Sequence, residues 1–140
     1  IAACYTFGSP RVGDAEWMSN IKTPVYRVVN AADCVTMMPP GGETIAVISK
    51  AIGAVPFGRT FSDWLQSRFG GYVHGGDMRY LTNCPNGNYE KVSLLYSVSW
   101  LYRVMGVWKN NLAASKTLAD HSMSTYRKKL TVVARQRNLD

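Results

Sequence analysis

The chain has 140 residues and a formal charge of +7, from 16 lysine and arginine residues against 9 aspartate and glutamate residues. This length fits one domain or part of one, and the basic surplus favours anionic partners. The three cysteines, Cys4, Cys34 and Cys84, are too few and too unevenly spaced for a disulfide framework or a paired-cysteine zinc site.

A βαβ unit is predicted at the start of the chain. Residues 1–7, IAACYTF, form a β-prone run that ends before Pro10, and residues 25–30, VYRVVN, predict a second strand. A short helix is expected between them, from Gly13 to Ile21. Two strands joined by a helix suggest a parallel sheet with helices on its faces, an α/β fold. Reactive groups of such sheets gather in the loops after the carboxyl ends of strands, where GSPRVG and NAADCV lie.

The first residues already belong to an apolar run and do not follow a basic segment, so they do not have the pattern of a signal peptide. Because the sequence starts at Ile1 rather than Met, within an apolar run, we expect the polypeptide to continue upstream. Further along, residues 41–58 are apolar but interrupted by Lys50 and Gly53, and they are too short to span a bilayer. A turn at Gly75-Gly76 is predicted to lead into a short strand.

Two helices are predicted in the last third of the chain. Residues 92–108, VSLLYSVSWLYRVMGVW, carry one charge, Arg103, and favour a buried helix. A helix lying in a membrane interface, with Trp and Tyr side chains at headgroup depth, is the alternative. Asp120 is expected to cap the N-terminus of a final helix, which places His121 at the entrance of that helix.

Asp33 and His121 are the candidate catalytic residues. Hydrolysis by a serine nucleophile also needs a carboxylate and an imidazole, and α/β-hydrolases place them in the order Ser, Asp or Glu, His, with the serine in G-x-S-x-G. No such pentapeptide occurs here, and Ser9 does not replace it, because Pro10 and Arg11 occupy the positions of the second glycine and the helix start. The chain can therefore supply the acid and the base of a triad whose serine lies upstream.

Four blocks of sequence resemble the downstream half of class 3 lipases, the fungal-type triacylglycerol lipase family. They are YTFGSPRVGDAEW (5–17), YRVVNAADCVTMMPP (26–40), YVHGG (72–76) and DHSMSTY (120–126). The resemblance implies that residues 1–140 are the carboxyl-terminal half of an α/β-hydrolase-type domain without its GHSLGG nucleophile elbow. It implies that Asp33 is the triad acid and His121 the base, and that no metal or organic cofactor is used. His74 resembles another frequent histidine of the family, which is not usually the base; we expect His74 to be structural, and a role as a fallback base is the alternative.

The resemblance also implies an acylglycerol or phospholipid substrate at a lipid surface. The basic run YRKKLTVVARQR (126–137) favours attraction to anionic headgroups and a location peripheral to a membrane. Because no aromatic series or nucleic-acid motif accompanies this run, no nucleic acid partner is expected. The alternative is a catalytically inactive lipase-like subunit or interaction module of a larger assembly. In both cases the exposed strand edges must be covered, either by the upstream half of the domain or by another protein chain.

Overall fold

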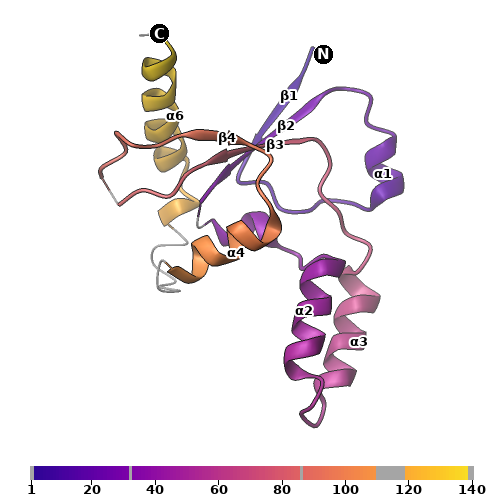
Figure 1. The fold of residues 1–140 in the computed structure, drawn as a ribbon. Helices are drawn as coiled ribbons and strands as arrows, with labels where there is room; N and C mark the ends of the chain where they lie inside the picture. Colours follow the sequence, from indigo (N-terminus) through magenta and orange to yellow (C-terminus); the bar gives the residue numbers. More distant parts are fainter. Residues whose placement is uncertain (1, 32, 86, 110–118, 139–140) are drawn as a thin grey trace. The chain divides into compact units, whose positions relative to one another are not determined.

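A computed structural model describes residues 2–31, 33–85, 87–109 and 119–138. Figure 1 shows the helices and strands of these residues. The chain divides into two compact units. The sheet unit consists of Ile1–Ser9, Thr23–Thr36 and Gly76–Asp140, and the hairpin unit consists of Pro10–Lys22 and Met37–Gly75.

The sheet unit contains a mixed four-stranded sheet in the order β1-β2-β3-β4. Its strands are β1 (Cys4–Phe7), β2 (Val25–Asn30), β3 (Asp77–Leu81) and β4 (Leu94–Tyr96). The first three are parallel, and β4 is antiparallel to β3. The predictions of two strands near the start, a parallel pairing and an α/β architecture are confirmed. The sheet unit also holds the helices α4 (Trp100–Lys109) and α6 (Met123–Arg137). The 3-10 turn η1 (Cys34–Met37) belongs to it up to Thr36.

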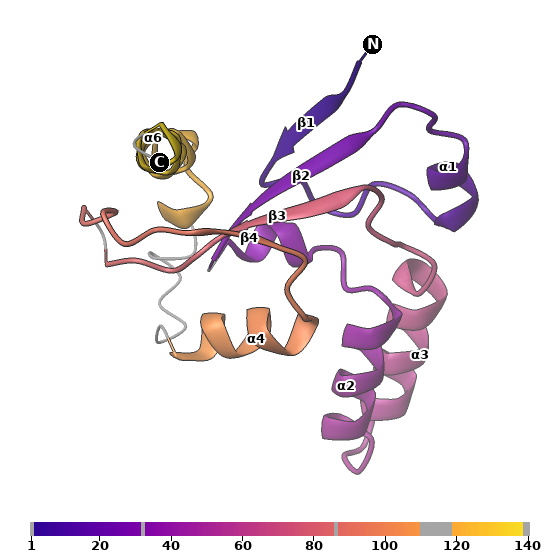
Figure 2. The same ribbon diagram turned by 45° about the horizontal axis from the view of Figure 1, so that its top comes forward.

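The two faces of the sheet pack against different helices because side chains alternate along each strand. Val28 of β2 belongs to a buried cluster with Tyr126 of α6. The next residue, Val29, points to the other side and clusters with Tyr80, whose ring centroid lies 5.8 Å from that of Tyr102 in α4. Helices α6 and α4 therefore cover opposite faces of the sheet, as Figures 1 and 2 show.

The prediction of one helix over residues 92–108 is wrong. Residues Leu94–Tyr96 form β4 and pair with β3, Ser97 has a φ of 59°, and α4 begins only at Trp100. A short apolar run is compatible with both a strand and a helix. The backbone groups at the free edge of β3 need hydrogen-bond partners, and residues 94–96 supply them as a strand.

The expected burial of this helix is wrong as well. Leu101 and Met105 of α4 are 59% and 48% exposed, whereas the one charged residue, Arg103, is buried. The Arg103 guanidinium donates to Thr36 Oγ1 at 2.7 Å, so the charge is buried because it has a polar partner beside it.

The hairpin unit contains a short helix and a helical hairpin. Helix α1 (Ala15–Ser19) begins after Asp14, whose carboxylate accepts from the Trp17 amide at 2.8 Å, and it confirms the helix expected between the first two strands. Helices α2 (Gly42–Ile52) and α3 (Gly58–Phe69) lie side by side (Figure 1), and each contributes a buried side chain, Ile45 and Leu65 respectively. None of the helices in the described part of the chain is both long and apolar enough to cross a membrane.

Candidate active site

Asp33 lies just beyond the carboxyl end of β2, at the start of η1. Its backbone amide donates to the Asn30 carbonyl at 3.0 Å, and its own carbonyl accepts from Thr36 Oγ1 at 2.8 Å. Because Thr36 is in turn bonded to the buried Arg103, the loop that carries Asp33 is fixed from two sides. Its side chain is fully buried. This position agrees with the prediction that reactive groups follow the strands.

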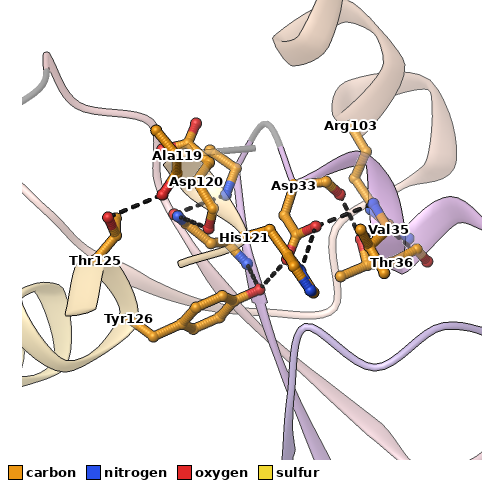
Figure 3. A network of polar contacts seen from close by, with 11 residues as sticks. Asp33, Val35, Thr36, Arg103, Ala119, Asp120, His121, Thr125 and Tyr126 are labelled. Atoms are coloured by element: carbon orange, nitrogen blue, oxygen red, sulfur yellow. Dashed lines mark hydrogen bonds and ion pairs between the residues drawn. The ribbon is translucent and has the colours of Figure 1, made fainter. Parts of the chain in front are cut away.

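The structure brings Asp33 and His121 together. The imidazole Nδ1 lies 3.1 Å from Oδ1 and 3.0 Å from Oδ2 of Asp33, although the two residues are 88 positions apart (Figure 3). A carboxylate is an acceptor, so this contact favours the tautomer with the proton on Nδ1 and a free lone pair on Nε2. The imidazole is 38% exposed, and within the described segments Nε2 has no hydrogen-bond partner. The site can therefore accept a proton at a solvent-facing nitrogen.

Tyr126 of α6 holds the other side of the same carboxylate. Its hydroxyl donates to Asp33 Oδ2 at 2.7 Å and accepts from the Asn30 amide at 2.9 Å. Burial, followed by the hydrogen bond to Asp33, raises the pKa of the Tyr126 phenol far above its ordinary value. The phenol thus stays a donor to the carboxylate throughout the neutral and mildly alkaline range. Figure 3 shows Tyr126 and His121 converging on Asp33.

A second group of polar contacts joins α6 to the end of β2. The ammonium of Lys129, which is fully buried, donates to Asn30 Oδ1 at 2.6 Å and to the Thr82 carbonyl at 2.9 Å. The Asn30 amide nitrogen Nδ2 donates to the carbonyl of Asp120 at 2.8 Å. Since Tyr126 and Lys129 are three positions apart, they lie on the same face of α6, and both bind Asn30 at the end of β2.

Gly8, the residue after β1, closes the site from a third side. It has a φ of 62°, and a Cβ at this position would lie 2.9 Å from Asp33 Oδ2 and 3.0 Å from His121 Nδ1. Glycine thus meets two requirements here, a left-handed backbone and close approach to the Asp33–His121 pair.

Several parts of this network were not predicted from the sequence. Tyr126 belongs to the DHSMSTY block but had no assigned role, and Lys129 and Gly8 were not considered as site residues. The sequence feature that could have identified Tyr126 and Lys129 is their three-residue spacing on a predicted helix, which places them on the same face. The prediction that Asp120 caps the last helix is wrong, because the N-cap is Ser122 and the Asp120 side chain is buried.

The remaining candidates from the sequence are His74, possible metal ligands and the three cysteines. His74 belongs to the hairpin unit, whereas the Asp33 carboxylate is bonded to His121, Tyr126 and the Val35 amide. Within the residues that the structure describes, no three His, Cys, Asp or Glu side chains are grouped as a metal site. The three cysteines are free thiols.

Removing the Tyr126 hydroxyl should destabilise the protein. In Tyr126→Phe, the buried Asn30 amide loses its acceptor and Asp33 loses a donor, so we expect the free energy of unfolding to fall by about 1 to 3 kcal/mol. Because the pKa of this phenol is raised, its contribution is complete below pH 10 and is lost only at higher pH, and the loss should therefore be equal at pH 6 and pH 9. Chemical denaturation checks this, with Tyr102→Phe as the control. A loss below about 0.5 kcal/mol would contradict a structural role for this hydroxyl.

Comparison with known proteins identifies one similarity. Residues 1–43 match the family described as lipase (class 3). This confirms the resemblance to class 3 lipases at the level of a partial domain, and the matched segment includes β1, β2 and Asp33 but ends before His121. No curated protein and no solved structure matches the chain.

Proposed function

We propose, from the match of residues 1–43 to the class 3 lipase family, that this chain is the carboxyl-terminal half of an α/β-hydrolase domain that cleaves carboxylic esters. The observation that carries the proposal is the contact between the buried Asp33 carboxylate and Nδ1 of a partly exposed His121. In this role His121 is the general base and Asp33 orients it, and neither residue hydrolyses an ester without a nucleophile.

The proposed reaction proceeds by acyl transfer to a serine. His121 Nε2 takes the proton of the serine hydroxyl as its oxygen attacks the ester carbonyl carbon, and Asp33 stabilises the imidazolium that forms. When the tetrahedral intermediate collapses, the alcohol leaves with the proton from Nε2 and an acyl-serine remains. Water then attacks this acyl group, giving its proton to Nε2, and the released serine recovers that proton.

The serine is proposed to come from an upstream strand that pairs with β1. Within the described segments β1 pairs only with β2, and it exposes Tyr5 and Phe7, which are 62% and 41% accessible. An edge strand with exposed aromatic side chains is expected to be covered by another strand or another chain. A parallel strand beside β1 would end next to Gly8, and Gly8 approaches His121. A nucleophile elbow at that end would therefore lie near the His121 imidazole.

The proposed substrates are acylglycerols, with phospholipids as the alternative, and no metal or organic cofactor is proposed. The support is the match of residues 1–43 to the class 3 lipase family. The rival proposal is a catalytically inactive lipase-like subunit in which another protein chain covers β1. It is favoured by the lack of a G-x-S-x-G motif in these residues.

Ester hydrolysis by the whole encoded polypeptide separates the two proposals. We expect the segment upstream of Ile1 to contain G-x-S-x-G, and the purified polypeptide to hydrolyse p-nitrophenyl butyrate and emulsified triacylglycerol. A folded polypeptide that hydrolyses neither ester nor phospholipid would support the inactive subunit.

A further inference from the structure

Helix α3 carries a row of exposed side chains that do not take part in its packing against α2. Phe57, immediately before α3, and Phe61, Trp64 and Arg68 within it follow the spacing of four, three and four that places residues on one face of a helix. Phe57 is 85% exposed, and Phe61 and Trp64 are each 50% exposed. The rings of Phe61 and Trp64 stack with their centroids 5.9 Å apart.

A different face of α3 packs within the hairpin. The buried residues of this helix are Gly58, Ser62 and Leu65, each one position after a member of the exposed row. The two rows are therefore turned by about 100° from each other. Packing against α2 thus does not explain the aromatic residues of the exposed row, and an exposed aromatic cluster of this kind indicates an interaction surface.

The tip of the hairpin is apolar and is bracketed by cations. Residues 51–58, AIGAVPFG, contain no charge, and Lys50 and Arg59 stand directly before and after them. Phe57 has a φ of 68°, and a Cβ on Gly58 would overlap the Ile52 carbonyl oxygen, so the turn that presents Phe57 is tightly defined. We call residues 50–64 the hairpin tip.

We propose that the hairpin tip inserts into the surface of a bilayer that contains anionic phospholipids. Its apolar side chains would enter the acyl boundary while Lys50 and Arg59 meet the headgroup phosphates. The carboxylates of α2 and α3 are Glu43, in the first turn of α2 and so at the far end of that helix from the tip, and Asp63. With Lys50, Arg59 and Arg68, α2 and α3 have three cations against these two anions. Both residues that flank the uncharged segment 51–58 are cationic, and Asp63 is the one carboxylate within the hairpin tip.

A lipid surface fits this shape better than a protein partner does. Phe57 projects from a turn between two helices, and a protein would need a groove that encloses it, whereas a bilayer accepts a protruding apolar tip without a preformed site. The proposal stands on the hairpin alone, and vesicle binding is measured without turnover, so it can fail or succeed independently of the proposed ester hydrolysis.

Binding of the full chain to vesicles tests the proposal. Cosedimentation with phosphatidylcholine vesicles containing phosphatidylserine should show binding that weakens at least about tenfold in Phe57→Ser/Phe61→Ser. The matched control is Leu101→Ser/Met105→Ser in α4, whose side chains are also about half exposed, and its binding should change less than about twofold. Charge reversal in Lys50→Glu/Arg59→Glu should weaken the preference for anionic vesicles more than the α4 control does, although the basic residues of 126–137 remain. Circular dichroism verifies that each variant is folded.

Hydrogen exchange on vesicles locates the surface. We expect slower amide exchange at residues 50–64 when vesicles are present. Vesicle binding that is unchanged in Phe57→Ser/Phe61→Ser, or lost equally in the α4 control, would overturn the proposal. So would the finding that Phe57→Ser/Phe61→Ser converts a dimer in solution into a monomer without changing vesicle binding, because the tip would then be covered by a second copy of the chain.

Discussion

His121→Ala in the intact domain is expected to lower the turnover number for ester hydrolysis by about 10⁴-fold or more. The variant removes the only group that we propose to carry the serine proton. The fold should survive, because the imidazole is partly exposed and the Asp33 carboxylate keeps its bonds to Tyr126 and the Val35 amide. Steady-state kinetics with p-nitrophenyl butyrate and thermal unfolding of the same preparations measure both effects.

His74→Ala is the matched control for this prediction. His74 belongs to the hairpin unit, so its removal should act mainly through stability, and the turnover per folded molecule should remain near that of the parent. Equal losses of turnover in the two variants, at equal folded fraction, would overturn the assignment of His121 as the base.

Asp33→Asn should lower turnover by a similar factor, about 10⁴-fold, without displacing the imidazole. An amide nitrogen facing Nδ1 is a donor, so it favours the tautomer with the proton on Nε2, and that nitrogen can no longer accept the serine proton. With the amide oxygen in the place of Oδ2, the Tyr126 hydroxyl retains its acceptor, while the Val35 amide loses the acceptor that it has in Oδ1. This second change should lower stability, whereas the loss of turnover per folded molecule should come from the wrong tautomer.

The tautomer is the readout that separates this explanation from misfolding. Nitrogen-15 NMR of the imidazole should show a protonated Nδ1 in the parent protein and a protonated Nε2 in Asp33→Asn. Asp63→Asn, a change of the same chemistry in α3 of the hairpin unit, should leave tautomer and turnover unchanged. Turnover of Asp33→Asn within tenfold of the parent, or the same tautomer in both proteins, would contradict the role given to Asp33.

The central pair of the site could be predicted because the blocks around Asp33 and His121 resemble class 3 lipases. Local features alone, an aspartate after a strand and a histidine before a helix, do not assign a catalytic role to either residue. The contacts that support this pair could not be predicted from the sequence, because they join residues far apart in the chain. Tyr126 reaches Asn30 across 96 positions and Lys129 reaches it across 99, and no local propensity specifies either pairing.

The errors in the fold have the same origin. Residues 94–96 are compatible with a helix, and the choice of a strand depends on the edge of β3, which comes from a separate part of the chain. Similarly, Ser122 rather than Asp120 caps α6, because Asp120 is buried where its carbonyl accepts from Asn30. In both cases tertiary contacts outweigh the local preference.

The central claim is that Asp33 and His121 serve a serine supplied from upstream, and labelling of the whole encoded polypeptide with a fluorophosphonate probe tests it most directly. The probe reacts only with an activated serine. The predicted result is one labelled serine upstream of Ile1, with labelling lost in His121→Ala and kept in His74→Ala. Labelling of a serine within these 140 residues, labelling that persists in His121→Ala, or no labelling of the folded polypeptide would contradict the claim.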